Sequence, residues 1–546
     1  MVVNKIILNI TRVKFKLFDT FIIRSTNQSR MFSSLISLIQ KTVFLIVILI
    51  VGCVETRDKP SHLTRPNVIV FYTDDMNFDD LGCYTANFET PNIDQLAKQG
   101  VKFTRYIPST SLCSPSRYSV LTGRYASRSD VLPREYPYDE PVFIRWNTDI
   151  IQGDKTIAHL MKNRGYVTGF TGKWHNWAKG SLPLWHVPDH EDPENPLMVQ
   201  KIEKNYQLTL DTVKLTSGFD YVGAVYATNF NWLPITSKLM YHNQHWITHH
   251  SLQFIEENKD KPFFLYTAST IPHAPAPIRS LKADPRATPA GYKTDHLNAQ
   301  PSYESILERA TKDGLNEKEL NKRATMIWLD DAVGAIVDKL EKLGIRDNTL
   351  IIFASDHQSY GKMTCNLGKA PFIINWPGHF EEGEVIDELI SNIDVVPTVL
   401  EASGVPQTDV KLDGISLLPL INDTSTDWRS SLYMEVTYTR GVATKDYKYI
   451  ATRFPSEIED QITSENRHLF TQEGLKMKEG EGDRYNAFKK FPGYFDDDQL
   501  YDLRKDSLEQ NNLAGDPEYA QVMTEMKAKL KAYSADLPYA FGEFSE

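Results

Sequence analysis

Four short apolar runs, each followed closely by ionisable side chains, limit the folds that this chain can adopt. The runs are rich in β-branched and aromatic residues, which is typical of strands buried on both faces of a sheet. Helical patterns separate them, and the longest covers about 317–343 and ends at Gly344. Strands that alternate with helices favour an α/β fold with a large, mostly parallel sheet sandwiched by helices. The runs cover residues 67–72, 166–171, 263–267 and 350–354.

The ionisable residues behind these runs are the first candidates for a functional site. In a parallel sheet the carboxyl ends of the strands share one edge, so residues far apart in sequence can converge there. Taken singly, each charged set is typical of a helix cap or a solvated turn, whereas four sets in sequence order indicate a site. The residues are Asp74 and Asp75, Lys173 and His175, His273, and Asp356 and His357.

The acidic members of this group predict a bound cation. Adjacent carboxylates such as Asp74 and Asp75 repel each other and need a cation or a shared proton. With Asp356 they make a hard, oxygen-rich group suited to one Ca²⁺ ion, with Mg²⁺ as the alternative. His357 is a less typical ligand for calcium. The sequence therefore predicts a divalent metal site at the strand ends.

Composition and patterning divide the chain into a large and a small part. At 546 residues the chain can bury a large core, and its formal charge of −11 gives no reason to expect nucleic-acid binding. Later in the chain, strand-like runs at 431–438 and 447–452 precede an amphipathic helix at 516–533. We expect a main α/β domain, which carries the candidate site, over 66–425. A C-terminal α+β subdomain with a small antiparallel sheet and a terminal helix is expected over 426–546.

The N-terminal region indicates an export signal. Residues 44–51 are uninterruptedly apolar and are followed by Gly52 and Cys53, which favours a secretory signal over a membrane-spanning helix. Residues 50–53 resemble the bacterial lipobox, in which the cysteine is lipidated and becomes the first residue of the mature protein. An uncleaved membrane anchor is the alternative.

These features predict a bacterial lipoprotein. We expect residues 1–53 to be the signal and lipobox region, with Met31 as the true start, and the polar residues 54–65 to be a tether. Lipid on Cys53 would anchor the exported protein to a membrane, in the periplasm or at the cell surface.

The most specific motif is Cys113-Ser114-Pro115-Ser116-Arg117, which opens an apolar helical segment with Leu-Thr-Gly at its end. It resembles the signature of the type I sulfatases, whose cysteine is oxidised after synthesis to formylglycine, an aldehyde. Residues 165–175, which end in Gly-Lys-Trp-His, match the second family signature closely. The resemblance extends from about residue 65 to the C-terminus. It implies an alkaline-phosphatase-like fold, hydrolysis of sulfate esters, and a formylglycine-generating or equivalent modifying enzyme as a partner.

The resemblance also implies roles for individual residues. The formylglycine hydrate at position 113 would attack sulfur and form a covalent sulfo-enzyme, from which its second hydroxyl expels sulfate. His175 would take the proton of that hydroxyl, and His273 would donate a proton to the departing sugar oxygen. The implied metal ligands are Asp74, Asp75, Cys113, Asp356 and His357, while Arg117 and Lys173 would hold the nucleophile and Lys362 a sulfate oxygen.

One segment departs from the family pattern and leaves the sulfate-binding lysine open. Gly361-Lys362-Met363-Thr364 fits the lysine segment of the family. The family then usually shows Tyr-Glu and Arg-Val-Pro, whereas residues 366–371 read Asn-Leu-Gly-Lys-Ala-Pro. Lys362 is therefore the first candidate, and Lys369, which falls where the arginine of the family would be, is the alternative.

The stretch between Asn176 and His250 is rich in Trp and His and predicts the kind of substrate. Indoles stack on sugar faces, although most single tryptophans fill the core. With Trp177 and Arg440 as candidate substrate-binding residues, we expect a sulfated polysaccharide or oligosaccharide. The alternatives are a phosphate or phosphonate ester hydrolase of the same superfamily and an inactive glycan-binding lipoprotein.

Overall fold

The computed structural model describes residues 65–85, 88–177, 184–405, 410–423, 427–477 and 487–542. All of them belong to one compact unit, Arg65–Glu546. The predicted signal region, the lipobox with Cys53 and nearly all of the predicted tether lie outside the described residues. No helix within the described ranges is long and apolar enough to cross a membrane.

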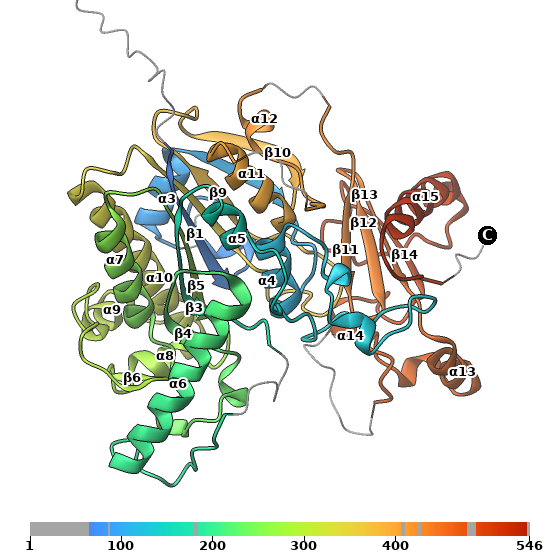
Figure 1. Cartoon of the computed structure of the whole chain (residues 1–546). Helices are drawn as coiled ribbons and strands as arrows, with labels where there is room; N and C mark the ends of the chain where they lie inside the picture. The colour runs from blue at the N-terminus through green and yellow to red at the C-terminus, as the bar shows by residue number, and fades with distance from the viewer. Residues whose placement is uncertain are drawn as a thin grey trace, which may run out of the picture. The chain divides into compact units, whose positions relative to one another are not determined.

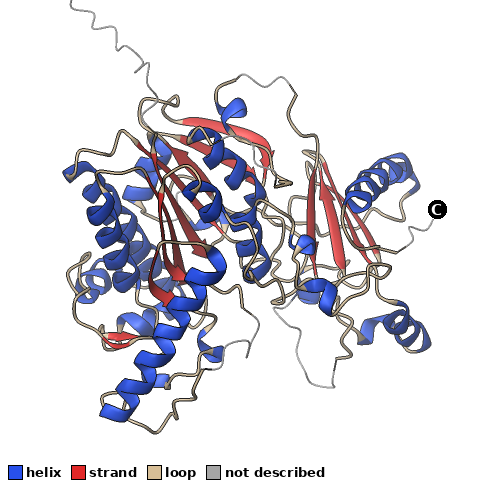
Figure 2. Cartoon of the chain, in the orientation of Figure 1, coloured by secondary structure: helices blue, strands red, loops and turns tan. Residues whose placement is uncertain are grey.

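An eight-stranded sheet forms the centre of this unit (Figures 1 and 2). Five neighbouring pairs are parallel, and only the two pairs that involve β9 are antiparallel, which confirms the predicted mostly parallel sheet. The four strands expected from the sequence are the contiguous central strands β8, β1, β5 and β3. In spatial order the strands are β10 (Glu384–Ile390), β2 (Val101–Tyr106), β9 (Phe372–Asn375), β8 (Thr349–Ser355), β1 (Asn67–Asp74), β5 (Phe263–Pro272), β3 (Val167–Lys173) and β4 (Tyr221–Tyr226).

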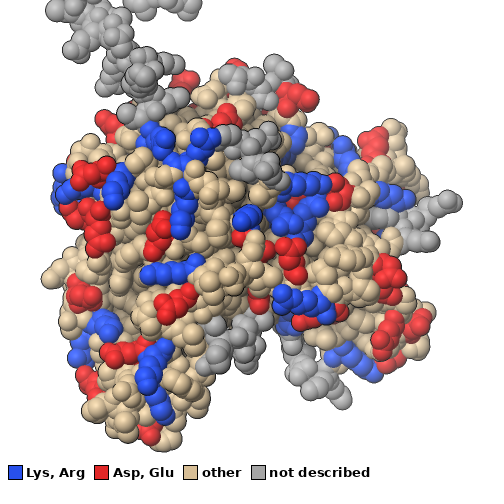
Figure 3. Space-filling model, viewed as in Figure 1, with Lys and Arg blue, Asp and Glu red and all other residues tan. Residues whose placement is uncertain are grey.

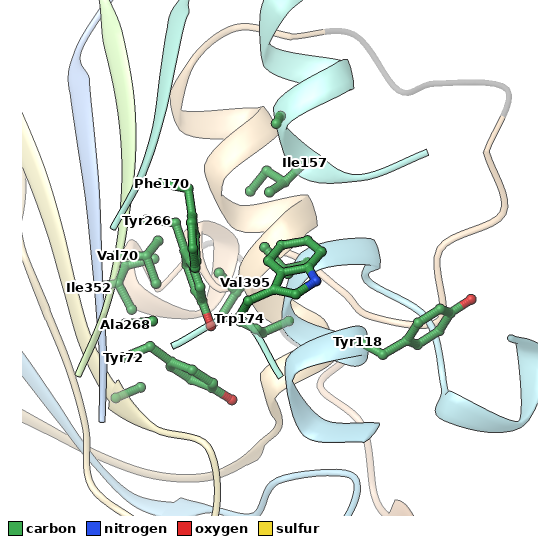
Figure 4. Close-up of a cluster of buried hydrophobic side chains, with 14 of the residues drawn as sticks. Val70, Tyr72, Tyr118, Ile157, Phe170, Trp174, Tyr266, Ala268, Ile352 and Val395 are labelled. Carbon is green, nitrogen blue, oxygen red and sulfur yellow. The ribbon is translucent and has the colours of Figure 1, made fainter. Parts of the chain in front are cut away.

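Helices cover both faces of the sheet, because its central strands are apolar on both sides (Figure 2). In β1, Val70 and Tyr72 face one core cluster while Ile69 and Phe71 face the other. Figure 4 shows the first cluster, in which the ring of Trp174 lies near those from β3 and β5. On that side lie α4 (Cys113–Thr122), α5 (Ile157–Lys162), α6 (Pro196–Ser217) and α11 (Val395–Ala402); α3 (Pro91–Lys98), α9 (Tyr303–Ala310) and α10 (Glu317–Lys342) cover the other, with α7 (Gln244–Asn258) against α10.

Strand β9 departs from the parallel pattern for a local reason. The chain reverses after β8, so residues 356–371 begin and end at the same edge of the sheet, where the Ser355 amide donates to the Pro371 carbonyl at 3.3 Å. This reversal keeps Lys362 close to the carboxyl ends of the parallel strands. Short remaining elements are α8 (Pro277–Leu281), α12 (Leu418–Ile421), β6 (Ala287–Thr288) and β7 (Gly291–Tyr292).

The C-terminal region forms the expected small antiparallel sheet. Its order is β11 (Leu432–Val436), β12 (Thr439–Ala443), β13 (Tyr447–Thr452) and β14 (Asp498–Asp502). Helix α15 (Ala520–Asp536) packs Met526 and Leu530 against tyrosines of this sheet. The helices α13 (Ser456–Ser464) and α14 (Ala487–Lys490) lie in the connection before β14. The domain boundary expected at 425/426 falls within residues 424–426, which the structure does not describe, and stays a prediction.

The surface carries charges of both signs. On the face shown in Figure 3, Lys and Arg side chains are interspersed with Asp and Glu side chains. This mixed pattern is ordinary for a globular protein with a small excess of acids.

Candidate active site

The ends of four strands bring ionisable side chains to one edge of the sheet. Asp74 is the last residue of β1 and Lys173 the last of β3, while His273 follows β5 and Asp356 follows β8 directly. Strand β1 is parallel to both β5 and β8, with Asp74 opposite Pro272. The convergence expected from parallel topology is therefore present in the structure.

Cys113 reaches the same point from a helix. It is the first residue of α4, behind the extended Leu112, and its side chain is fully buried. The Cys113 sulfur lies 3.5 Å from His357 Nε2. The amino end of a helix favours negative charge, so α4 presents residue 113 where a thiolate or another anion is stabilised.

Three cations neutralise the acids of the cluster. The Lys173 ammonium pairs with Asp74 and donates to Asn229 Oδ1 at 2.8 Å. Lys362 Nζ donates to both oxygens of Asp75 at 2.8 and 2.9 Å. The Arg117 guanidinium, also fully buried, pairs with Asp356 at 3.1 Å. Buried charges need such partners, because an unpaired ion is expensive away from water.

The two fully buried carboxyls differ in their preference for the charged form. Burial disfavours ionisation of both, yet the Lys173 ammonium holds the pKa of Asp74 below its usual range. Burial raises the pKa of Asp356, and the neighbouring Asp74 charge adds to this effect. Two carboxyls that cannot easily ionise together are stabilised in their charged forms when a cation lies between them.

The thiol and the histidines have shifted pKa values as well. Burial opposes ionisation of Cys113, but the ammonium groups of Lys173 and Lys362 hold its pKa well below the ordinary value. Burial and the charge of Lys173 lower the pKa of His175 to about 4, so that this imidazole is neutral at physiological pH. Despite burial and the nearby Lys173, the carboxylates of Asp74 and Asp75 raise the pKa of His273.

The donor set fits a divalent cation. Ligand atoms of Asp74, Cys113, Asp356 and His357 lie within 4.8 Å of one another, and so do those of Asp74, Asp75, Cys113 and His273. Asp74 Oδ1 is buried and has no hydrogen-bond partner within the described chain. A buried carboxylate oxygen without a donor is costly, and a metal ion would satisfy it.

The structure separates the two lysine candidates. Lys362 is buried and contacts Asp75 in the cluster, whereas Lys369 is exposed and forms no hydrogen bond or ion pair with the residues of the cluster. Lys362 is thus the lysine that the fold brings to the candidate site.

Two candidate substrate-binding residues lie elsewhere. Trp177 is buried in the core with its ring 6.3 Å from that of Trp174, so the fold uses it for packing. Arg440 is buried in β12 and donates to the carbonyls of Thr437, Thr439 and Val142 at 2.7–2.9 Å. Its guanidinium satisfies backbone acceptors, and neither residue lines the cleft at the cluster.

A cleft of about 700 Å³ opens above the cluster and contains residues that sequence reasoning missed. Asn229 follows β4, so the strand-end argument could have found it if the Gly-containing run 221–226 had been recognised as a strand. Trp146 had no signal in the sequence. It comes from a segment without a helix or strand pattern, and its ring meets that of Trp232 at 5.7 Å.

The loop that carries Lys362 is held from two sides. Asn77 Oδ1, just behind the acids of β1, accepts hydrogen bonds from the backbone amides of Ser359 and Tyr360 at 3.0 and 3.1 Å. From the small sheet, Lys448 Nζ donates to the Leu367 carbonyl at 2.7 Å and pairs with the fully buried Glu509. The small sheet therefore fixes the position of this loop.

We expect Glu509→Ala to lower the free energy of unfolding by about 3–5 kcal/mol, because it leaves the Lys448 ammonium buried without its partner. Urea titration measures the change. Glu465→Ala is the matched control: Glu465 pairs with Lys476 at the surface, and its loss should cost less than about 1 kcal/mol. Equal losses in the two variants would show that the buried pair does not hold the loop.

A sheet edge with a helix-borne nucleophile position, paired acids, two lysines and three histidines is typical of a hydrolase of anionic esters. Residues 66–405 match the sulfatase family model, and residues 361–462 match the C-terminal region of N-sulphoglucosamine sulphohydrolase. The first match covers more than half of the chain. The chain belongs to the sulfatase family, whose members are sulfuric ester hydrolases.

Individual relatives agree with this assignment. Human arylsulfatase A is 28% identical over 514 residues, which cover 86% of this chain and 88% of that protein. The N-acetylglucosamine-6-O-sulfatase of Bacteroides thetaiotaomicron is 25% identical over 526 residues, covering 86% of each. The solved structure of BT4656 in complex with D-glucosamine-2-N,6-O-disulfate has a TM-score of 0.54 and 19% identity, covers 87% of this chain and 99% of that one, and supports the fold.

Proposed function

We propose that this sulfatase removes sulfate from a sulfated glycan and uses formylglycine at position 113 with one bound Ca²⁺ ion. The observation that carries the proposal is the convergence of Cys113 with the acids that end or follow β1 and β8, two lysines and three histidines at one sheet edge. A sulfate ester brings a dense anion, and hydrolysis needs a nucleophile, neutralised oxygens and a proton for the leaving group.

Residue 113 would supply the nucleophile. When converted and hydrated, it offers two hydroxyls, one to attack sulfur and one whose proton loss lets the aldehyde form again as sulfate leaves. The imidazole of His175, whose lowered pKa favours its neutral form, adjoins the Cys113 side chain and would accept that second proton. Conversion requires a modifying enzyme that oxidises the thiol. The proposal therefore includes such an enzyme as a partner.

Charge neutralisation would come from the residues around position 113. Asp74, Asp75, Asp356 and His357 would hold the ion, which supplies positive charge for a sulfate oxygen and for the deprotonated hydroxyl of residue 113. Calcium fits because it tolerates irregular oxygen-rich sites. Lys362 and Lys173 lie beside residue 113. Lys362 would hold a sulfate oxygen, and Lys173 would orient residue 113.

His273 would protonate the leaving oxygen. Its Nδ1 lies 2.6 Å from the Ala274 carbonyl, an acceptor, so Nδ1 carries a proton. Its raised pKa favours a second proton on Nε2, which lies 3.6 Å from Asp75 Oδ2 and lines the cleft. A protonated imidazole at the cleft can act as a general acid.

We expect His273→Gln to lower kcat on a sugar sulfate by about 10²–10³-fold and much less on a nitrophenyl sulfate. A sugar alkoxide needs a proton to leave, whereas a nitrophenolate does not. Steady-state kinetics on both substrates measures the difference. Equal losses on the two would assign His273 a structural role in place of proton donation.

Relatives suggest the substrate class. A homologue that acts on N-acetylglucosamine 6-sulfate and a structural neighbour bound to a sulfated glucosamine are both carbohydrate-directed. Desulfation assays on a panel of defined sulfated oligosaccharides, with aryl sulfate and aryl phosphate beside them, test the proposal. Sugar desulfation supports it, and faster turnover of the aryl phosphate with no sugar desulfated would favour the phosphate or phosphonate ester alternative.

We also propose that Cys53 is lipidated and anchors the exported enzyme to a bacterial membrane. The support is the sequence of residues 50–53 after an apolar run. Metabolic labelling with a fatty acid should mark the wild-type protein and not Cys53→Ala. Labelling of both proteins, or of neither, would contradict the proposal.

A further inference from the structure

The cleft beside the reacting groups is lined by residues of different chemistry. Asp75, His273 and Lys362 of the cluster line part of it. Aromatic side chains, chief among them Trp146 and Trp232, form one part of the lining, and Arg279 from α8 forms another. These outer residues have no role in the chemistry described above, so they are candidates for recognition of the substrate beyond its sulfate.

The aromatic part is fixed in place and adjoins the catalytic centre. The Trp232 ring lies 5.7 Å from that of His175 in a T-shaped contact, and Trp146 meets Trp232 in the same manner. The guanidinium of Arg145 lies 4.6 Å from the centre of the Trp146 ring. Both indoles are only partly buried, and partly exposed indoles beside a polar site offer a surface for a sugar ring.

Arg279 differs from the other cations of the site. Arg117, Lys173 and Lys362 each pair with a carboxylate of the cluster. The Arg279 side chain is exposed and forms no ion pair with any residue that the structure describes. An arginine in a cleft with no acidic partner presents a planar set of donors that matches a carboxylate or sulfate group.

The position of Arg279 is set by the segment that carries His273. His242 Nε2 bonds the Pro275 carbonyl at 2.9 Å, and the His242 amide donates to Ser280 Oγ at 2.9 Å. The Ile278 amide donates to Asn321 Oδ1 at 2.9 Å. These contacts hold the backbone of α8 on both sides of Arg279, so the side chain starts from a fixed point at the cleft.

We propose that Arg279 binds a second anionic group of the substrate, a sulfate or a carboxylate, while the sugar ring contacts Trp232. The enzyme would then prefer acidic saccharides that carry two anions over those that carry only the sulfate to be removed. The proposal rests on the sulfatase function proposed above and adds to it the class of sugar that the cleft selects.

The test compares substrates with and without a second anion. Wild type, Arg279→Gln and Arg279→Lys are assayed on a nitrophenyl sulfate, a monosulfated neutral disaccharide, a disulfated disaccharide and a monosulfated disaccharide that contains a uronic acid. We expect Arg279→Gln to raise KM on one or both dianionic sugars by about 10- to 100-fold, because the variant loses a charged hydrogen bond to the second anion. On the other two substrates kcat/KM should stay within about twofold. Arg134→Gln, an exposed arginine outside the cleft, is the control.

The outcomes separate this proposal from the proposed function. Selective loss on the disulfated sugar identifies the second anion as sulfate, and selective loss on the uronate identifies it as a carboxylate. An equal change on all substrates, or none on the dianionic sugars, overturns the proposal. Failure of the wild type to turn over the nitrophenyl sulfate would instead contradict the proposed function. Binding of the disulfated sugar to Cys113→Ala, which has no nucleophile at position 113, is measured by calorimetry with and without the Arg279→Gln change and gives a readout independent of turnover.

Discussion

Replacing Cys113 by serine is expected to lower kcat for sulfate esters by about 10⁴-fold or more while the fold is retained. Serine is close to cysteine in size and fits the buried first turn of α4. It offers one hydroxyl, however, and no thiol that can be oxidised to an aldehyde. A sulfated serine would have no second hydroxyl to release sulfate, so turnover should stop at that stage.

Steady-state kinetics and circular dichroism on the purified variant test this expectation. Cys83→Ser is the matched control, because Cys83 is a partly buried free cysteine that lies outside the cluster. The control should retain activity. A Cys113→Ser variant with near wild-type kcat would mean that residue 113 is not the nucleophile.

Removal of the cation should have the second largest effect. Chelation, or Asp74→Asn, is expected to lower kcat/KM by about 10³-fold, because charge on the sulfate oxygens would lose its strongest partner. The Lys173 ammonium would also lose its carboxylate in the variant. Added Ca²⁺ should restore the chelated enzyme and not the variant.

A stability measurement detects the ion without reference to turnover. Ca²⁺ at about 100 times its Kd should stabilise the folded wild type by about 2.7 kcal/mol and raise its Tm. Asp74→Asn should lose that response, whereas Asp79→Asn, a nearby acid outside the cluster, should keep it. Wild-type protein whose Tm and activity ignore both chelator and Ca²⁺ would contradict a metal at this edge.

The sequence predicted the central sheet because the signal there is strong. The runs that became β1, β3, β5 and β8 are β-branched and buried on both faces, and the parallel arrangement forces their ends to one edge. The acids, the histidines and Lys173 at those ends were therefore found from the residues alone, whereas Lys362 was found from the family resemblance. The link to Cys113 came from the motif at the start of α4.

Other parts depended on packing that no local pattern reports. Trp177 and Trp232 look alike in the sequence, yet Trp177 fills the core and Trp232 lines the cleft. The Arg440 guanidinium donates hydrogen bonds to backbone carbonyls and therefore has a structural role. Asn366 stands where the sequence departs from the family pattern, and it bonds Glu509 at 3.0 Å, a contact between segments far apart in the chain. Such contacts are set by tertiary structure.

In the proposed function, a converted Cys113 performs the chemistry at the gathered strand ends. Mass spectrometry of the peptide that contains residue 113, on preparations made with different amounts of modifying enzyme, measures the converted fraction directly. We predict that specific activity on a sulfate ester rises in proportion to the fraction that carries an aldehyde in place of the thiol. Full activity in protein whose Cys113 is entirely an unmodified thiol would contradict the account.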